Sequence, residues 1–212
     1  MAEPYLRQSP LAHLQLLAAG EASEEAEVVM REHAHRTMVT LRGNSEDEGF
    51  RSAVSATVGI APPTEALTAA TSGARSILWM GPDEWLVVAP PDQRETLPAK
   101  LATALEGQDA AVVEVGESMT VIELSGRRAA DVIAKGCTID LHPSVFQPGR
   151  VVRTLLAKAG VIIHQTSPIS PDGTPAYEIP VYEVYVHRSF ADYAWRWLED
   201  AGLEYGVAIA GG

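Results

Sequence analysis

The sequence predicts an α+β protein built from two successive ferredoxin-like units, each with the order strand–helix–strand–strand–helix. Segments typical of strands alternate with segments typical of helices after residue 36. A strand that ends in glycine occurs at Leu41-Arg42-Gly43 and again, 83 residues later, at Leu124-Ser125-Gly126. The elements after each of these strands follow the order of a split βαβ unit. We therefore expect antiparallel sheets with helices on one side. An ancient duplication would explain the repeat, and chance similarity between α+β units is the alternative.

Residues 1–36 are expected to form an N-terminal arm. A short helical pattern opens at Ser9-Pro10, with leucines at Leu11, Leu14 and Leu17. Residues 21–27 include four glutamates and are typical of a solvated segment. Such an arm could wrap a partner or form a loosely packed terminal helix, and the sequence leaves both open.

The first unit is expected at residues 37–109, where a strand ends at Gly43. Asn44 and Ser45 are expected to cap the next helix, whose first turn is acidic, as the helix dipole favours. Gly59 ends this helix. Its apolar face consists of residues spaced by four, Phe50, Val54 and Val58.

A hairpin and a second helix complete the first unit. Strands at 76–80 and 84–89 are joined by Gly81-Pro82-Asp83, a typical hairpin turn. A helix is expected over about 92–106, with leucines in step at Leu97, Leu101 and Leu105.

The second unit is expected at residues 110–212 and repeats the same order, so that both units form one compact body. A strand over 120–126 is followed by a helix over 127–135 that Gly136 ends. Three further strands are expected at residues 151–157, 160–165 and 182–186. The last helix is expected over 190–203, capped by Ser189.

Composition excludes several classes of protein. Of the 212 residues, 46% are hydrophobic, which excludes disorder as the main state. The net charge of −12 argues against a nucleic acid partner, because phosphate binding requires an excess of Lys and Arg. A single cysteine, Cys137, excludes an intrachain disulfide and is expected to be a buried structural thiol. The sequence lacks the pattern of a signal peptide or a membrane span, and we expect a cytoplasmic protein without membrane contact.

Motifs for chemistry are not found in the sequence. Neither G-x-G-x-x-G nor G-x-x-x-x-G-K-[ST] occurs, the six histidines are scattered, and Ser125 lies outside a G-x-S-x-G motif. Glu114, Glu117 and Glu123 are expected to lie along strands, and their spacing does not indicate a role in acid–base catalysis. We therefore predict no catalytic, cofactor-binding or metal-binding residue in this chain.

The aromatic residues indicate contact with another protein. On the last helix, Trp195 lies about 200° around the axis from Trp197. If Trp197 and Ala201 face the core, Trp195 points outward. Exposed Trp, Tyr and Arg are enriched at protein interfaces. We therefore expect a subunit interface that includes Trp79, Trp85, Arg188, Tyr193, Trp195 and Arg196. The alternative is that Trp195 and Trp197 both lie at the edge of the core.

Three long strings resemble the gamma subunit of heterotetrameric sarcosine oxidase. They are Leu78–Val88 (LWMGPDEWLVV), Ala134–Pro143 (AKGCTIDLHP) and Val186–Glu199 (VHRSFADYAWRWLE). The resemblance runs from about residue 37 to 200, and a similar Ser-Pro-Leu begins at Ser9. Three matching strings in the right order make it specific.

This resemblance implies a subunit of a bacterial cytoplasmic enzyme made of four different subunits. The family oxidatively demethylates sarcosine to glycine with formation of hydrogen peroxide, and transfers the one-carbon unit to tetrahydrofolate as 5,10-methylenetetrahydrofolate. It implies alpha, beta and delta subunits as partners, with FAD and FMN on beta, NAD on alpha and zinc on delta. The gamma subunit of the family has no assigned cofactor. This chain is thus expected to be a non-catalytic structural subunit that packs against the large folate-binding subunit.

The second half also resembles the folate-binding core of the glycine-cleavage aminomethyltransferases. A strand ending in Ser125-Gly126, a helix, the turn Pro148-Gly149 and a strand pair follow that family's order. That family carries paired acidic residues on the second strand of the pair, where this chain has Ile163 and His164. We expect the fold to be shared without folate chemistry. A chain that binds folate or one-carbon units is the alternative.

Overall fold

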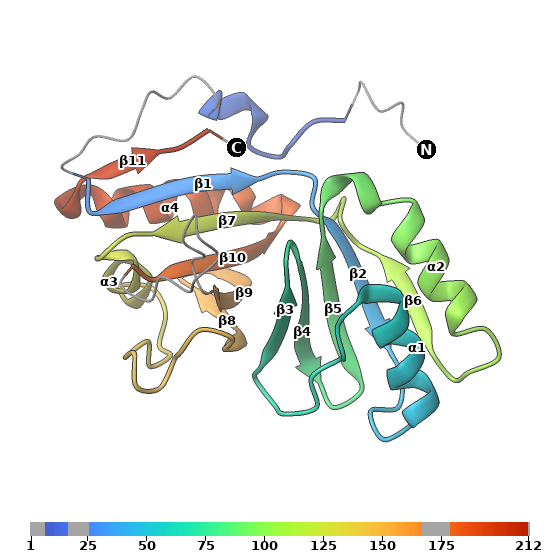
Figure 1. The fold of residues 1–212 in the computed structure, drawn as a ribbon. Helices are drawn as coiled ribbons and strands as arrows, with labels where there is room; N and C mark the ends of the chain where they lie inside the picture. Colours follow the sequence, from blue (N-terminus) through green and yellow to red (C-terminus); the bar gives the residue numbers. More distant parts are fainter. Residues whose placement is uncertain (1–6, 17–25, 167–178, 212) are drawn as a thin grey trace.

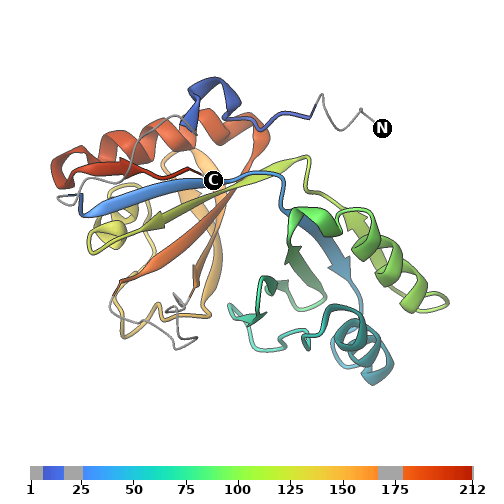
Figure 2. The ribbon, with the colours of Figure 1, turned by 45° about the horizontal axis from the view of Figure 1, so that its top comes forward.

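Two β-sheets pack against each other, and each is covered on its outer side by two helices (Figure 1). This computed structural model describes residues 7–16, 26–166 and 179–211. Figure 2 shows the sheets inclined to one another, with a pair of helices at each outer side. The layers are therefore helix, sheet, sheet and helix, as predicted for an α+β fold.

The first sheet has five strands in the order β3-β4-β5-β2-β6, each antiparallel to its neighbours. Its strands are β2 (Thr37–Arg42), β3 (Ala69–Ser72), β4 (Arg75–Gly81), β5 (Glu84–Ala89) and β6 (Ala111–Glu114). Its helices are α1 (Glu48–Val58) and α2 (Thr96–Ala104). Every strand and helix predicted between residues 37 and 109 is present.

The second sheet has six strands in the order β11-β1-β7-β10-β9-β8. Its strands are β1 (Val28–His33), β7 (Met119–Ser125), β8 (Val151–Leu156), β9 (Ala159–Thr166), β10 (Val181–His187) and β11 (Val207–Ile209). Its helices are α3 (Ala129–Ala134) and α4 (Ala191–Gly202), with a 3-10 turn at Arg188–Phe190 leading into α4.

The two halves repeat one another in topology. When β1 is set aside, the second sheet has the order β8-β9-β10-β7-β11, which matches β3-β4-β5-β2-β6 element for element along the chain. Strand β1 lies between β7 and β11, with Met30 opposite Leu124 on one side and Ile209 on the other. The repeat predicted from the two glycine-terminated strands is therefore present in the fold, with one strand inserted into the second copy.

The boundaries predicted for the units need two corrections. The arm predicted at residues 1–36 is wrong for residues 28–33, because β1 is an inner strand whose Val28 and Met30 are buried. The boundary predicted between 109 and 110 is also misplaced, since β6 pairs with β2 of the first sheet. Short strands of four to six residues alternate too few times to be recognised reliably from periodicity.

The N-terminal residues that precede β1 also pack onto their own chain. A 3-10 helix occupies Ala12–Leu14, and Leu11 is buried in the core of the second half. Most of the predicted acidic segment at 21–27 lies outside the described residues. The described part of the predicted arm is thus integrated into the second half.

Three apolar cores hold the layers together. One lies under α1 and α2, and one lies under α3 and α4. The third lies between the inner faces of the sheets, where Leu78 and Leu86 of the first sheet meet Val121 and Tyr185 of the second. Burial of apolar area on both faces of each sheet fixes the four-layer arrangement.

The first helix begins later than the sequence suggested. Asp47, not Asn44 or Ser45, is its N-cap, and its carboxylate accepts hydrogen bonds from the amides of Gly49 at 2.8 Å and Phe50 at 3.4 Å. Asn44 instead accepts a hydrogen bond from the Glu46 amide in the preceding turn. The predicted face at Phe50, Val54 and Val58 is buried.

The last helix presents a different face to the core from the one predicted. Trp195 is buried together with Ala191, Ala194 and Leu198. These residues are spaced by three or four, so they lie on one face of the helix. Trp197 is half-buried and packs at the edge of the same core. Helix α4 has no side-chain cap at its N-terminus, so the predicted Ser189 cap is wrong.

Candidate functional site

The structure divides the residues predicted for a subunit interface into buried and exposed ones. Trp85 is 0% exposed, and its Nε1 donates to the carbonyl of Pro63 at 2.8 Å. Trp195 is 1% exposed. The prediction of an interface role is therefore wrong for Trp85 and Trp195, because their own chain already covers them. Strand β5 is an inner strand, and α4 turns its tryptophan toward the sheet.

Tyr193 lies on the outer side of α4, where it is 37% exposed. Phe190, three residues earlier, is 43% exposed, and residues spaced by three are neighbours on a helix surface. Trp79 is half-buried on β4 against the core of the first half, so the structure does not bring it together with α4. The exposed aromatic pair Phe190 and Tyr193 is hereafter called the α4 patch.

The two predicted arginines flank the α4 patch and have partners in their own chain. Arg188 donates to the carbonyl of Gln8 at 2.8 Å. Arg196 donates to Asp192 at 3.1 Å, and the ring of His13 lies 2.7 Å from the same carboxylate. The N-terminal residues therefore border the α4 patch.

A buried carboxylate that sequence reasoning missed lies on the inner face of the second sheet. Glu183 of β10 is 8% exposed and stands opposite His164 of β9. Its Oε2 accepts from the Tyr185 hydroxyl at 2.5 Å and lies 3.4 Å from His164 Nδ1, while Arg36 lies 3.6 Å from Oε1. Ile163 and His164 hold no carboxylate, as the sequence shows, but the neighbouring strand supplies one opposite His164. An acidic residue inside an apolar strand was the sequence signal.

The environment of Glu183 keeps it ionised. Burial raises the pKa of this carboxyl, but the hydrogen bonds from His164 and Tyr185 and the charge of Arg36 outweigh burial and lower the pKa to about 2. Burial, with the nearby carboxylate, raises the pKa of the Tyr185 phenol well above its ordinary value. The tyrosine therefore stays protonated and acts as a donor.

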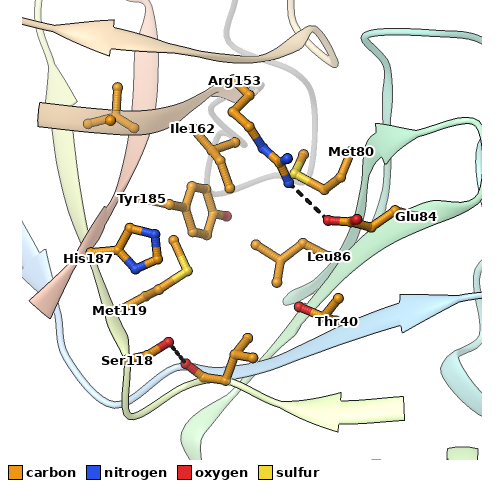
Figure 3. Close-up of a pocket in the computed structure, with 13 residues that line it drawn as sticks. Thr40, Met80, Glu84, Leu86, Ser118, Met119, Arg153, Ile162, Tyr185 and His187 are labelled. Atoms are coloured by element: carbon orange, nitrogen blue, oxygen red, sulfur yellow. Dashed lines mark hydrogen bonds and ion pairs between the residues drawn. The ribbon is translucent and has the colours of Figure 1, made fainter. Parts of the chain in front are cut away.

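A cleft of about 370 Å³ lies between the inner faces of the two sheets (Figure 3). The first sheet contributes Glu84 and Leu86, and the second contributes Arg153 and Tyr185. Glu84 accepts hydrogen bonds from Arg42 at 2.5 Å and Arg153 at 3.0 Å. Burial raises the pKa of Glu84, but these hydrogen bonds outweigh it and lower the pKa, so the carboxylate is charged.

The described residues also bear on metal binding, membrane crossing and the single thiol. In residues 7–16, 26–166 and 179–211, no group of three or more His, Cys, Asp or Glu is arranged to hold a metal ion. No helix in that part of the chain is long and apolar enough to cross a membrane. Cys137 is a free, buried thiol 3.7 Å from the Thr154 hydroxyl, as predicted.

Comparison with known proteins gives a consistent result. The model of the sarcosine oxidase gamma subunit family matches residues 42–204. The sarcosine oxidase subunit gamma of Arthrobacter sp. is 33% identical over 201 residues, which cover 94% of this chain and 92% of that protein. One chain of the heterotetrameric sarcosine oxidase from Corynebacterium sp. U-96, in complex with pyrrole 2-carboxylate, superposes with a TM-score of 0.79 at 31% identity, covering 97% of this chain and 99% of that one.

A second solved structure bears on the fold alone. The glycine cleavage system aminomethyltransferase T from Bartonella henselae matches with a TM-score of 0.66 at 11% identity, over 91% of this chain and 57% of that one. The predicted resemblance to the aminomethyltransferase fold is therefore confirmed.

Proposed function

This chain belongs to the sarcosine oxidase gamma subunit family, and on that premise we propose that it is the gamma subunit of a heterotetrameric sarcosine oxidase. The observation that carries the proposal is the likeness, over nearly the whole length of both chains, to one chain of a solved heterotetrameric sarcosine oxidase. A protein that matches a subunit from end to end is expected to occupy the same place in an assembly.

In this proposal the chain is a structural subunit of a cytoplasmic enzyme. The complex oxidises the N-methyl group of sarcosine, reduces oxygen to hydrogen peroxide and releases glycine. Tetrahydrofolate takes up the one-carbon unit as 5,10-methylenetetrahydrofolate. FAD, FMN, NAD and zinc belong to the alpha, beta and delta subunits. Glu183 already has hydrogen-bond and ion-pair partners in its own chain, which supports a structural role for this buried carboxylate.

The α4 patch is the proposed contact with the other subunits. Phe190 and Tyr193 offer apolar area, and Arg188 and Arg196 lie beside them as polar neighbours. Aromatic residues and arginine dominate the binding energy of protein interfaces. Trp79 remains a predicted contact at a separate place in the first half.

Copurification tests this proposal. The tagged full chain is expressed together with the other three subunits and purified through its tag. We expect all four chains to elute together and to produce hydrogen peroxide when sarcosine is added. A complex of the other three subunits that is equally stable and active without this chain would contradict the proposed role.

A second candidate is a chain that itself binds folate, and Glu183 is the observation that favours it. This carboxylate lies beside the position where the resembled aminomethyltransferases carry an acidic residue. Its burial and its hydrogen-bond partners leave it little capacity for an external amine. Titration of the isolated full chain with tetrahydrofolate distinguishes the two candidates. Micromolar binding would favour a folate-binding chain over a purely structural subunit.

A further inference from the structure

The cleft between the sheets has the dimensions and lining of a small-molecule site. Its volume of about 370 Å³ lies at the lower end of the range for such sites, roughly 300–1,000 Å³. Its walls are mostly apolar and include Met80, Leu86, Met119 and Ile162. The two methionines are adaptable side chains that suit a binding surface. Figure 3 shows Met80 and Met119 on different sides of the cleft.

Gly160 borders open space in this cleft. It is the second residue of β9 and pairs regularly with Leu155 of β8, so the glycine does not mark a bulge. It lines the cleft, and a Cβ atom placed on it would meet no other atom within 4 Å. The space above Gly160 is therefore available to a bound molecule.

An exposed arginine in the cleft lining can bind an anion. The lining has one arginine, Arg153, and one carboxylate, Glu84, and Glu84 also pairs with Arg42 outside the lining. Arg153 uses one terminal nitrogen for Glu84, and its side chain is exposed, so its other N–H groups can reach a ligand. Arginine is well suited to binding a carboxylate through two parallel hydrogen bonds.

We propose that this cleft binds a small carboxylate with a compact apolar body, such as a single ring, which lies over Gly160 while its carboxylate accepts hydrogen bonds from Arg153. The apolar walls would contact the body of the ligand. The site goes beyond membership of an enzyme complex, because all of its residues belong to this chain.

Benzoate serves as the probe, and benzamide, which has the same shape without the charge, serves as its control. Each is titrated into the full chain and followed by the shift of backbone amide signals in NMR spectra. We expect saturable binding of benzoate and much weaker binding of benzamide. Equal binding of the two compounds, or no saturable binding of benzoate at millimolar concentration, would overturn the proposal.

Two substitutions locate the binding site. Arg153→Gln is expected to weaken benzoate binding about tenfold, which corresponds to about 1.4 kcal/mol. Arg150→Gln is the matched control, because Arg150 pairs with Glu65 away from the cleft lining, and it should leave binding unchanged. Equal affinity of the Arg153→Gln variant and the unmodified chain would contradict the assigned role.

A third substitution fills the cleft. Gly160→Phe places a ring in the free space and is expected to abolish benzoate binding, whereas Gly160→Ala should retain it. If Gly160→Phe does not fold, Arg153→Gln still decides. Gly160→Phe also tests whether a segment of a partner subunit, and not a small molecule, occupies the cleft. If Gly160→Phe folds and prevents assembly with the other subunits, the cleft receives a segment of a partner and the proposal fails. If the chain is not a subunit of sarcosine oxidase, benzoate binding by the full chain is still expected, so the two proposals fail separately.

Discussion

Glu183 shows how a charge is kept inside this protein. An unpaired buried carboxylate is costly, and it is tolerated where several donors surround it. Here the donors come from three places: Tyr185 on the same strand, His164 on β9 and Arg36 just before β2. Because Arg36 leads into the first sheet and Glu183 belongs to the second, the ion pair also joins the two halves.

The low pKa of Glu183 predicts that stability falls in acid. The pKa is about 2 in the folded chain against an ordinary 4.5, so the stabilisation is fully present above about 4.5 and is lost as the pH falls toward 2. The full loss should be on the order of 3 kcal/mol, of which about 2 kcal/mol should be lost by pH 3. Urea unfolding at about pH 6 and about pH 3 measures it. Glu183→Gln should reduce the difference between the two pH values, whereas Glu106→Gln, at an exposed position after α2, should preserve it. An unchanged difference in Glu183→Gln would contradict this origin.

The glycines that end β2 and β7 have a physical reason at the level of the element. A Cβ atom on Gly43 would overlap the ring of Phe50, where α1 packs down onto its sheet. A Cβ atom on Gly126 would overlap the backbone of Glu27, where the chain enters β1. The repeated sequence signal thus marks two close approaches, one to a helix and one to the inserted strand.

We predict that Gly126→Ala destabilises the protein more than Gly43→Ala. Gly126 has φ of +117°, which L-residues rarely adopt, and its neighbour is backbone that cannot turn away. The neighbour of Gly43 is a side chain, whose ring can shift. Gly126→Ala should lower the unfolding free energy by at least about 2 kcal/mol. Urea denaturation of both variants tests the order, with Gly107→Ala as a control that shares a positive φ but has open space around it. A smaller loss in Gly126→Ala than in Gly43→Ala would contradict the packing argument.

Elements with a clear hydrophobic periodicity were predictable from the sequence. Short elements, and those whose position depends on distant parts of the chain, were not. The face of α1 and the hairpin β4–β5 were found because their own residues specify them. Strand β1 was missed because its place is set by β7 and β11, which come much later in the chain. The face of α4 was misassigned because two tryptophans two residues apart compete for the core, and only packing decides between them.

At the scale of the whole molecule, the candidate surfaces depend on how the two halves meet. The cleft takes residues from seven strands in both sheets, and it exists only because the inner faces pack beside it. The sequence therefore could not predict the cleft, although Glu84 and Arg153 were visible in it. The α4 patch was predicted in part, since Tyr193 and its neighbouring arginines follow from one helix and its entry.

Assembly with the other subunits is expected to depend on the α4 patch. Phe190→Ser removes exposed apolar area from the α4 patch, so it should weaken association with the other subunits about tenfold or more while leaving the chain folded. Val113→Ser is the control, because Val113 is 52% exposed on β6 of the other half. Stepwise dilution of the copurified complex on a sizing column measures the dissociation of each variant. Dissociation promoted by Val113→Ser and not by Phe190→Ser would move the proposed interface to the first half.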